Sequence, residues 1–172
     1  AMDIVIRPIS AKRDEFRPSV SVALFLLTPF VLILPYYENR LFVSEYLPQF
    51  DFPWLSYVGI SCLLAGAFVI LCGRIQLGRY GGPKIAVEEE HKLITKGIYE
   101  HIRHPIYLGY LLLFTGFSLG FRSYLATVLI MMGLFVVFRS RMNLEERLLE
   151  HKFGEDYRSY LRRTKRLIPF LY

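Results

Sequence analysis

The residues best suited to chemistry lie in two clusters that flank one long apolar run. The first cluster, residues 97–109, reads GIYEHIRHPIYLG and contains two histidines, an arginine and two tyrosines. The second, residues 139–157, reads RSRMNLEERLLEHKFGEDY and follows the run directly. If the run folds back as a helical hairpin, both clusters end at the same face of that hairpin. The sequence therefore predicts one polar site made from two distant segments.

Helical geometry predicts which side chains of the two clusters meet. In a hairpin that turns near Arg122, Pro105 lies level with about Phe138, which puts Arg141 about one turn beyond that level. Glu145 follows Arg141 by four positions and shares its helix face. Three more side chains precede Pro105 on the same side: Tyr99, Arg103 and His104.

Each of these residues also has a purely structural interpretation. Pro105 suits the first turn of a helix, whose free N–H groups can hold a carboxylate or phosphate. Arg103 and His104 are equally typical of anchors at the level of lipid headgroups, where tyrosines form an aromatic belt. Arg141 and Glu145 are compatible with an ordinary surface ion pair. The functional interpretation depends on their convergence.

Composition favours a membrane protein. Of 172 residues, 53% are hydrophobic and 16% aromatic, and the mean hydropathy is +0.34, which is too apolar for a soluble domain of this length. The net charge of +6 suits nucleic acid or anionic lipid, and the apolar runs favour lipid. We therefore expect membrane lipids and no nucleic acid as partners, and the oligomeric state stays open.

Four membrane segments are expected. Residues 20–37 and 54–72 are uncharged runs long enough to cross a hydrocarbon core of about 30 Å, and Pro29 and Pro35 predict a kink in the first. Residues 105–138 carry one charge, Arg122, and a break at 120–123 makes them a short hairpin. Basic residues gather before the first run, after the second and in the tail, so both termini and the site are expected in the cytoplasm.

The predicted fold is all-α: a polytopic integral membrane protein with about four transmembrane helices, the last two a short hairpin, and cytosolic C-terminal helices. We expect one membrane domain over residues 1–172, in which 1–74 supply the N-terminal membrane helices and 75–172 carry the site. Residues 146–153 are typical of an amphipathic helix that Gly154 ends. Whether the 105–138 hairpin crosses the whole bilayer stays open.

Several common sites are missing from the sequence. GRYGGP at 78–83 does not fit the dinucleotide pattern GxGxxG, and there is no GxxxxGK[ST], HExxH or GxSxG. The four histidines, His91, His101, His104 and His151, lack the spacing of a zinc site, so no metal is expected.

Two segments together resemble the isoprenylcysteine carboxyl methyltransferase family of integral membrane enzymes. They are HKLITKGIYEHIRHPIYLG, residues 91–109, and RMNLEERLLEHKFGEDYRSY, residues 141–160. The resemblance covers roughly residues 75–172, and the pair of motifs is more specific than RHPxY alone, which phospholipid N-methyltransferases and membrane sterol reductases share in similar form.

The resemblance implies S-adenosylmethionine as cofactor, with S-adenosylhomocysteine as product, in a cytosolic pocket. It implies Arg141 and Glu145 as catalytic residues, with Arg141 facing the substrate carboxylate. The implied cofactor-binding residues are His91, Leu93, Ile94, Tyr99, His104, Tyr107 and Glu145.

The implied reaction is compatible with these side chains. A carboxylate acceptor is ionised at neutral pH and needs no general base, so Arg141 would only orient it. An amine acceptor would need Glu145 or His104 as proton acceptor. We expect a lipophilic, isoprenylcysteine-type substrate that enters from the bilayer. The alternatives are a phospholipid N-methyltransferase, an NADPH-dependent sterol-type reductase, suggested by RLIPFLY at 166–172, and a non-catalytic membrane lipid-binding protein.

Overall fold

The computed structural model describes residues 33–38, 40, 52–78 and 93–168. Over these residues the regular structure is helical apart from one isolated bridge. The helices are α3 (Trp54–Leu77), α4 (Pro105–Gly120), α5 (Tyr124–Phe153) and α6 (Glu155–Arg163), with a short 3-10 helix, η4 (Gly97–Glu100). The all-α prediction is confirmed for this part of the chain. Most of the predicted segment 20–37 lies outside the described residues, although 33–37 are helical.

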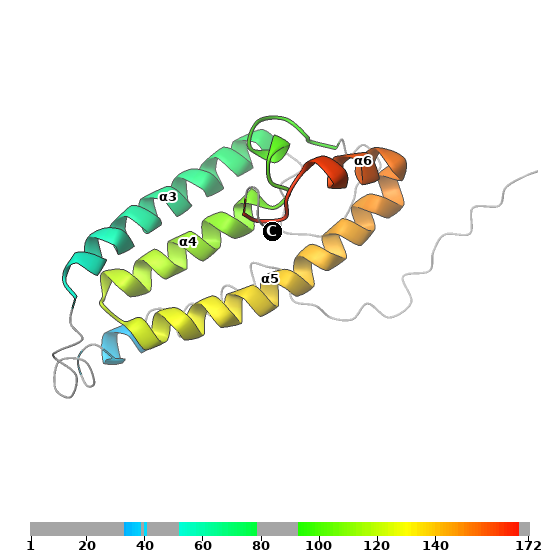
Figure 1. The fold of residues 1–172 in the computed structure, drawn as a ribbon. Coiled ribbons are helices and arrows are strands. Elements are labelled where there is room, and N and C mark those ends of the chain that lie inside the picture. The colour runs from blue at the N-terminus through cyan, green and yellow to red at the C-terminus, as the bar shows by residue number, and fades with distance from the viewer. Residues whose placement is uncertain (1–32, 39, 41–51, 79–92, 169–172) are drawn as a thin grey trace, which may run out of the picture.

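Glycines allow α3 and α4 to pack side by side along their length (Figure 1). A Cβ atom on Gly66 would lie 2.6 Å from the backbone oxygen of Gly109, and one on Gly116 would lie 2.4 Å from the backbone nitrogen of Leu63. Both separations are too short for any side chain, so the two backbones are in direct contact at these positions. The same arrangement brings small residues together in membrane helix pairs.

The hairpin between α4 and α5 turns where the sequence predicts it. Pro105 is the first residue of α4, and Gly120 is the last of its 16 residues. Arg122 takes a left-handed backbone conformation, φ 56°, which reverses the chain before α5 begins at Tyr124.

The second helix of the hairpin is longer than the sequence indicated. It runs for 30 residues without a break, past Phe138 and through the charged cluster, and ends where Gly154 has φ 54°. The expected helix 146–153 is therefore the last part of α5. Its side chains are held at fixed positions relative to the apolar part because one helix carries both.

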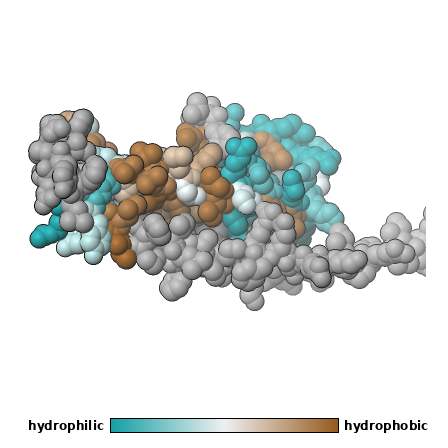
Figure 2. Space-filling model, turned by 90° about the horizontal axis from the view of Figure 1, so that it is seen from below, coloured by the Kyte–Doolittle hydropathy of each residue, from teal (hydrophilic) through white to brown (hydrophobic). Residues whose placement is uncertain are grey.

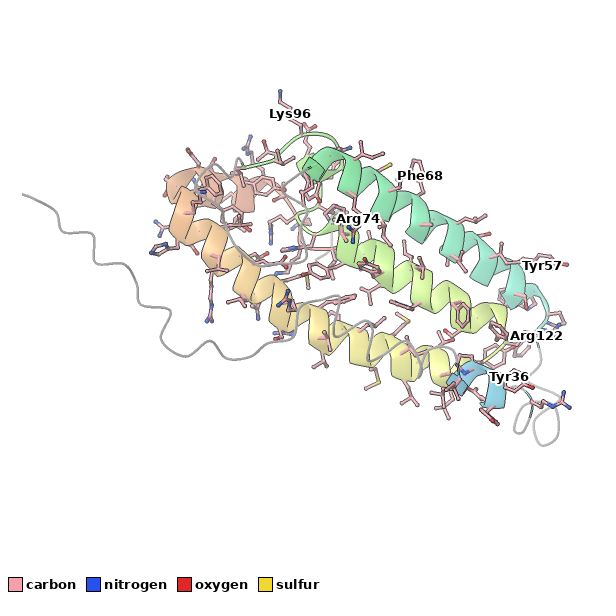
Figure 3. All side chains as sticks on the ribbon, turned by 180° about the vertical axis from the view of Figure 1, so that it is seen from behind. Tyr36, Tyr57, Phe68, Arg74, Lys96 and Arg122 are labelled. Atoms are coloured by element: carbon pink, nitrogen blue, oxygen red, sulfur yellow. The ribbon has the colours of Figure 1, made fainter. Side chains whose placement is uncertain are left out.

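Exposed apolar surface surrounds the middle of the molecule. Both α3 and α5 are long and apolar enough to cross a membrane, whereas α4 is shorter. Large side chains such as Tyr57 and Phe68 project from α3, away from α4 and α5 (Figure 3). Figure 2 shows a hydrophobic band between more hydrophilic ends. Such surface would be unfavourable in water, so these helices belong in lipid.

The C-terminal segment after α6 returns to the start of α4. Ile102 and Lys165 form a parallel bridge, and the amide of Arg103 donates to the carbonyl oxygen of Lys165 at 2.8 Å. Leu167 is buried and packs into the core with Tyr107 and other apolar residues of the hairpin. The segment thus covers the end of the hairpin that carries both predicted clusters.

The opposite end of the hairpin is held by an acid from the N-terminal part of the chain. Glu38 accepts hydrogen bonds from the Ser123 hydroxyl and from the backbone N–H groups of Leu125, at 2.9 Å, and Ala126, at 2.7 Å. These are free donors of the first turn of α5, so Glu38 acts as a helix cap supplied from a distant segment.

Candidate functional site

The first turn of α4 and the polar end of α5 meet through Tyr107 and Glu145. The Tyr107 hydroxyl donates a hydrogen bond to Oε1 of Glu145. On the other side of the same carboxylate, Nδ1 of His104 lies 3.6 Å from Oε2. Pro105 starts α4 immediately after His104, so both side chains are placed by the helix start. The structure thus joins the two sequence clusters at a single carboxylate.

Glu146, the next residue of α5, is the centre of a second set of contacts. Its carboxylate is largely buried and accepts from Nε of Arg103 at 3.0 Å and Nε of Arg166 at 3.1 Å. A second hydrogen bond from Arg166 reaches Oε2. The Nε2 atom of His104 lies 3.2 Å from Oε1. His104 therefore stands between two carboxylates, one on each ring nitrogen.

Burial and charge act in opposite directions on His104. Its burial lowers the pKa of the imidazole, but hydrogen bonds to Glu145 and Glu146 outweigh burial, and the pKa is raised above 6.5. The same opposition acts on Glu146. Burial raises the pKa of its carboxyl group, but hydrogen bonds from His104 and Arg166 outweigh burial and lower the pKa well below 4.5. Both effects favour a protonated imidazole beside an ionised Glu146.

Arg141 lies one turn before Glu145 on α5 and is only 5% exposed. Its guanidinium interacts with the hydroxyl of Tyr107. Its Nε atom is buried and has no hydrogen-bond partner among the residues that the structure describes. A buried charged donor without a partner is costly, so this position is suited to receive an acceptor atom from a bound molecule.

Tyr99 is fixed by the turn that precedes α4. The tyrosine hydroxyl donates to the carbonyl oxygen of Gly73 on α3 at 3.4 Å, and its carbonyl accepts from the hydroxyl of Tyr160 at 2.6 Å. Gln76 accepts a hydrogen bond from the backbone of Ile98 at 2.9 Å, which attaches η4 to the end of α3.

The predicted site residues differ in how closely the structure brings them together. His104, Tyr107, Arg141 and Glu145 form one contact network, and Tyr99 lies at the start of the same segment. Leu93 and Ile94 are partly buried before η4. The hydrogen bond and the ion pair of Glu145 in the described part of the chain go to Tyr107 and His104 instead. His91 lies outside the described residues.

Sequence reasoning missed three members of this region. Arg74, at the end of α3, donates from Nη2 to the hydroxyl of Tyr110 at 3.1 Å, one turn along α4 from Tyr107 (Figure 3). The sequence indicates Glu146 only as part of the second motif and of an amphipathic helix, and Arg166 only as part of the basic tail and of RLIPFLY. In the sequence, Arg74 is only one of the basic residues that predict the orientation of the chain in the membrane. No local pattern indicates Tyr110 as its partner.

The arrangement can bind an anionic group beside an apolar region. Arg141 supplies a buried cation at the point where the apolar part of α5 ends, and Arg74 adds a second cation nearby. The carboxylate of Glu145 can contact a cationic or amine-bearing ligand. Among the described residues, no group of three His, Cys, Asp or Glu side chains could hold a metal ion.

The fold and this network define a class: helical membrane proteins with a polar site at one end of an apolar hairpin. A family model described as phospholipid methyltransferase matches residues 54–156, which include α3, α4, α5 and the start of α6. The chain belongs to that family.

Relatives of known name point to one branch of methyltransferases. A probable protein-S-isoprenylcysteine O-methyltransferase of Oryza sativa subsp. indica is 31% identical over 70% of this chain and 64% of its own length. Protein-S-isoprenylcysteine O-methyltransferase B of Arabidopsis thaliana is 29% identical over 82% of this chain and 77% of its own. The chain thus spans slightly less than two thirds of the rice relative.

A comparison with solved structures supports the same fold. The eukaryotic intramembrane Ras methyltransferase ICMT, an isoprenylcysteine carboxyl methyltransferase, superposes with a TM-score of 0.74 at 22% identity. The match covers 90% of this chain and 55% of that chain. At this identity the likeness establishes the architecture.

Proposed function

We propose that this protein is an S-adenosylmethionine-dependent methyltransferase that methylates the carboxylate of a lipophilic, isoprenylcysteine-type substrate. The observation that carries the proposal is Arg141, a buried cation whose Nε atom lacks a partner among the described residues and which lies beside Tyr107 and Glu145. The names of the rice and Arabidopsis relatives support the same activity.

The residues near Glu145 suit the cofactor. Glu145 would accept from its amino group, and Tyr99, His104 and Tyr107 would surround it, with Leu93 and Ile94 contributing apolar contact. S-adenosylmethionine, when bound, supplies an electrophilic methyl group on a sulfonium ion. Aromatic faces of the tyrosines favour a cation. The protein's task is to hold donor and acceptor in line, which can contribute about 7–11 kcal/mol.

Arg141 and Arg74 favour a carboxylate acceptor over an amine. A guanidinium can hold a carboxylate through two parallel hydrogen bonds. It would repel a protonated amine, which would also have to lose a proton before attack. An isoprenylcysteine has one carboxylate on a long apolar chain, which fits a cation at the end of exposed apolar helices.

Phosphatidylethanolamine is the competing acceptor, because the family model carries the phospholipid methyltransferase description. We propose the carboxylate because two arginines lie next to Tyr107 and Tyr110 in the described structure. The phosphate of such a lipid would satisfy Arg141, but its amine would then need Glu145 as base.

The test is transfer of a labelled methyl group from S-adenosylmethionine by the purified full chain. An S-prenylated cysteine with a free carboxylate should be methylated, and the product should release methanol in base, as an ester does. The same molecule with an amidated carboxyl group is the control. Transfer only to phosphatidylethanolamine, in a base-stable product, would support the N-methyltransferase instead.

Calorimetry separates the remaining alternatives. Binding of S-adenosylhomocysteine but not NADPH is expected. Binding of NADPH alone would support a reductase, and binding of neither, together with no transfer, would support a non-catalytic lipid-binding protein.

We also propose four membrane crossings with both termini and the site in the cytoplasm. The asymmetric distribution of Lys and Arg in the sequence supports this orientation. The polar end of α5, with α6, would then lie at the cytosolic surface.

A further inference from the structure

We infer that Arg166, in the C-terminal segment, is a positioning residue for the cofactor site, acting through Glu146 on His104. This inference rests on the proposed function. Arg166 lies beyond the residues that the family model matches, and its guanidinium donates two hydrogen bonds to the carboxylate of Glu146. Glu146 in turn contacts His104, which gives Arg166 a route to the cofactor site.

The side chains form a continuous chain of contacts. Arg166 donates to both oxygens of Glu146, Glu146 lies 3.2 Å from Nε2 of His104, and Nδ1 of His104 faces Glu145. Two hydrogen bonds from one guanidinium fix the plane of a carboxylate as well as its position. With Glu146 fixed, the His104 ring can keep Nδ1 directed at Glu145.

Backbone contacts hold Arg166 in place from the other direction. The carbonyl oxygen of Arg166 accepts from the amide of His104 at 3.1 Å. The Arg103 guanidinium donates to the carbonyl oxygens of Leu161 and Thr164, which lie at the end of α6. The free carbonyls of a helix end are thus satisfied, and the segment that carries Arg166 starts from a fixed point.

A ligand-independent measurement can separate positioning from a simple charge effect. The groups that face His104 are Glu145 and Glu146 from α5, Tyr107 from α4, the neighbouring Arg103, and Arg166 through Glu146. Arg166 is a cation, so removing its charge alone would raise the pKa of His104. If Arg166 holds Glu146 against Nε2, its removal frees Glu146, and the pKa of His104 falls.

The experiment uses the full chain in detergent with labelled histidines. The His104 resonance is assigned by its loss in His104→Gln and titrated by NMR in wild type, Arg166→Ala, Arg166→Lys and Glu146→Gln. We expect the His104 pKa to fall in Arg166→Ala and Glu146→Gln, with partial recovery in Arg166→Lys. The control is Arg162→Ala, which removes an exposed arginine paired with Glu155. A raised or unchanged pKa in Arg166→Ala overturns the inference.

The same variants are then tested for S-adenosylhomocysteine affinity by calorimetry. We expect Arg166→Ala to bind about tenfold more weakly, the size expected for loss of a charged hydrogen bond. Combining Arg166→Ala with Glu146→Gln should cause little further loss of affinity, because both substitutions act through the same contact between Glu146 and His104. Additive losses, or a lowered His104 pKa with unchanged affinity, overturn the inference. If wild type itself fails to bind, the proposed function fails, while the titration still reports on positioning.

Discussion

Arg141 and Glu145 occupy the same face of α5 and contact the same tyrosine, yet they are suited to opposite ligand charges. Glu145 can hold the positive amino group of a cofactor, whereas Arg141 can hold the negative group of an acceptor. Their separation by one helical turn keeps these two tasks on neighbouring but distinct points of the site.

We predict that substitution separates the two tasks. Glu145→Gln should weaken S-adenosylhomocysteine binding about tenfold, because a charged hydrogen bond is lost. Arg141→Ala should leave that affinity nearly unchanged and lower kcat/KM for a prenylcysteine acceptor about a hundredfold, as loss of one aligned charged donor does. Calorimetry and labelled methyl transfer measure the two effects. Arg139→Ala, two residues away and exposed, is the matched control. Equal effects of both substitutions on affinity would show that the roles are not divided.

The pH dependence of stability should also reflect His104 and Glu146. A raised pKa in the folded state gives His104 a contribution that is complete below about pH 6.5 and is lost as pH rises through the raised value. A lowered pKa gives Glu146 a contribution that is complete above about pH 4.5 and is lost as pH falls through the lowered value. The two contributions coexist between these limits.

Thermal unfolding in detergent measures this dependence. The melting temperature should be highest between about pH 4.5 and 6.5 and should fall on the alkaline side. His104→Gln should remove most of that alkaline fall. His151→Gln, which changes an exposed histidine of α5, should retain this alkaline fall. An identical alkaline fall in His104→Gln and wild type would contradict the assignment.

At the scale of helices, α3 and α4 act as one rigid unit because their backbones touch. α5 joins this unit through the hairpin turn and through apolar contacts such as the ring pair Tyr107–Phe138, whose centroids are 4.9 Å apart. Tyr99, attached to α3 through Gly73, and His104, at the start of α4, keep their relative positions only while that unit is intact.

We predict that Gly116→Ala disrupts this unit. The added Cβ would meet backbone atoms of Gly59 and Leu63 at 2.5 Å or less, and backbone cannot move aside as a flexible side chain can. The expected cost of such overpacking is about 1–3 kcal/mol. Size-exclusion chromatography after heating measures the melting temperature, which should be lower for Gly116→Ala than for wild type. Gly133→Ala on α5, where a Cβ meets nothing within 4 Å, is the control and should be neutral. Equal melting temperatures for the two variants would contradict close backbone packing.

The whole molecule has a polar end, an apolar middle and a second polar end, which is the profile of a chain placed across a bilayer. Arg122 and the helical residue Tyr36 lie near one end of the helices, and Lys96 lies near the other (Figure 3). The candidate site belongs to the end where α6 returns to α4.

We predict that thiols placed at the two ends of the molecule are labelled from opposite sides of a sealed membrane. In a chain without Cys62 and Cys72, Phe121→Cys places a thiol at the hairpin turn, and Arg162→Cys places one on α6; both positions are exposed. A membrane-impermeant maleimide added to intact cells should label only Phe121→Cys, and inverted vesicles should reverse the result. Labelling of both positions from one side would contradict a hairpin that crosses the bilayer.

Local sequence was sufficient for several features of the fold. The helix start at Pro105 follows from the fixed φ of proline, and the helix end at Gly154 follows from the freedom of glycine to take a positive φ. The break at 120–123 follows from the residues that interrupt the apolar run. The common face of Arg141 and Glu145 follows from helical period alone. The number of membrane crossings stays a prediction, because most of the first run lies outside the described residues.

The amino-acid sequence by itself determined where α4 begins, where the hairpin turns and where α5 ends, and therefore that the two clusters would approach each other. Only the tertiary structure decided which side chains share a partner. Arg74 reaches Tyr110 because touching glycines bring α3 close to α4, and Arg166 reaches Glu146 because α6 sends the chain back to His104. Such pairings depend on the distance and angle between whole elements, which no local pattern of residues specifies.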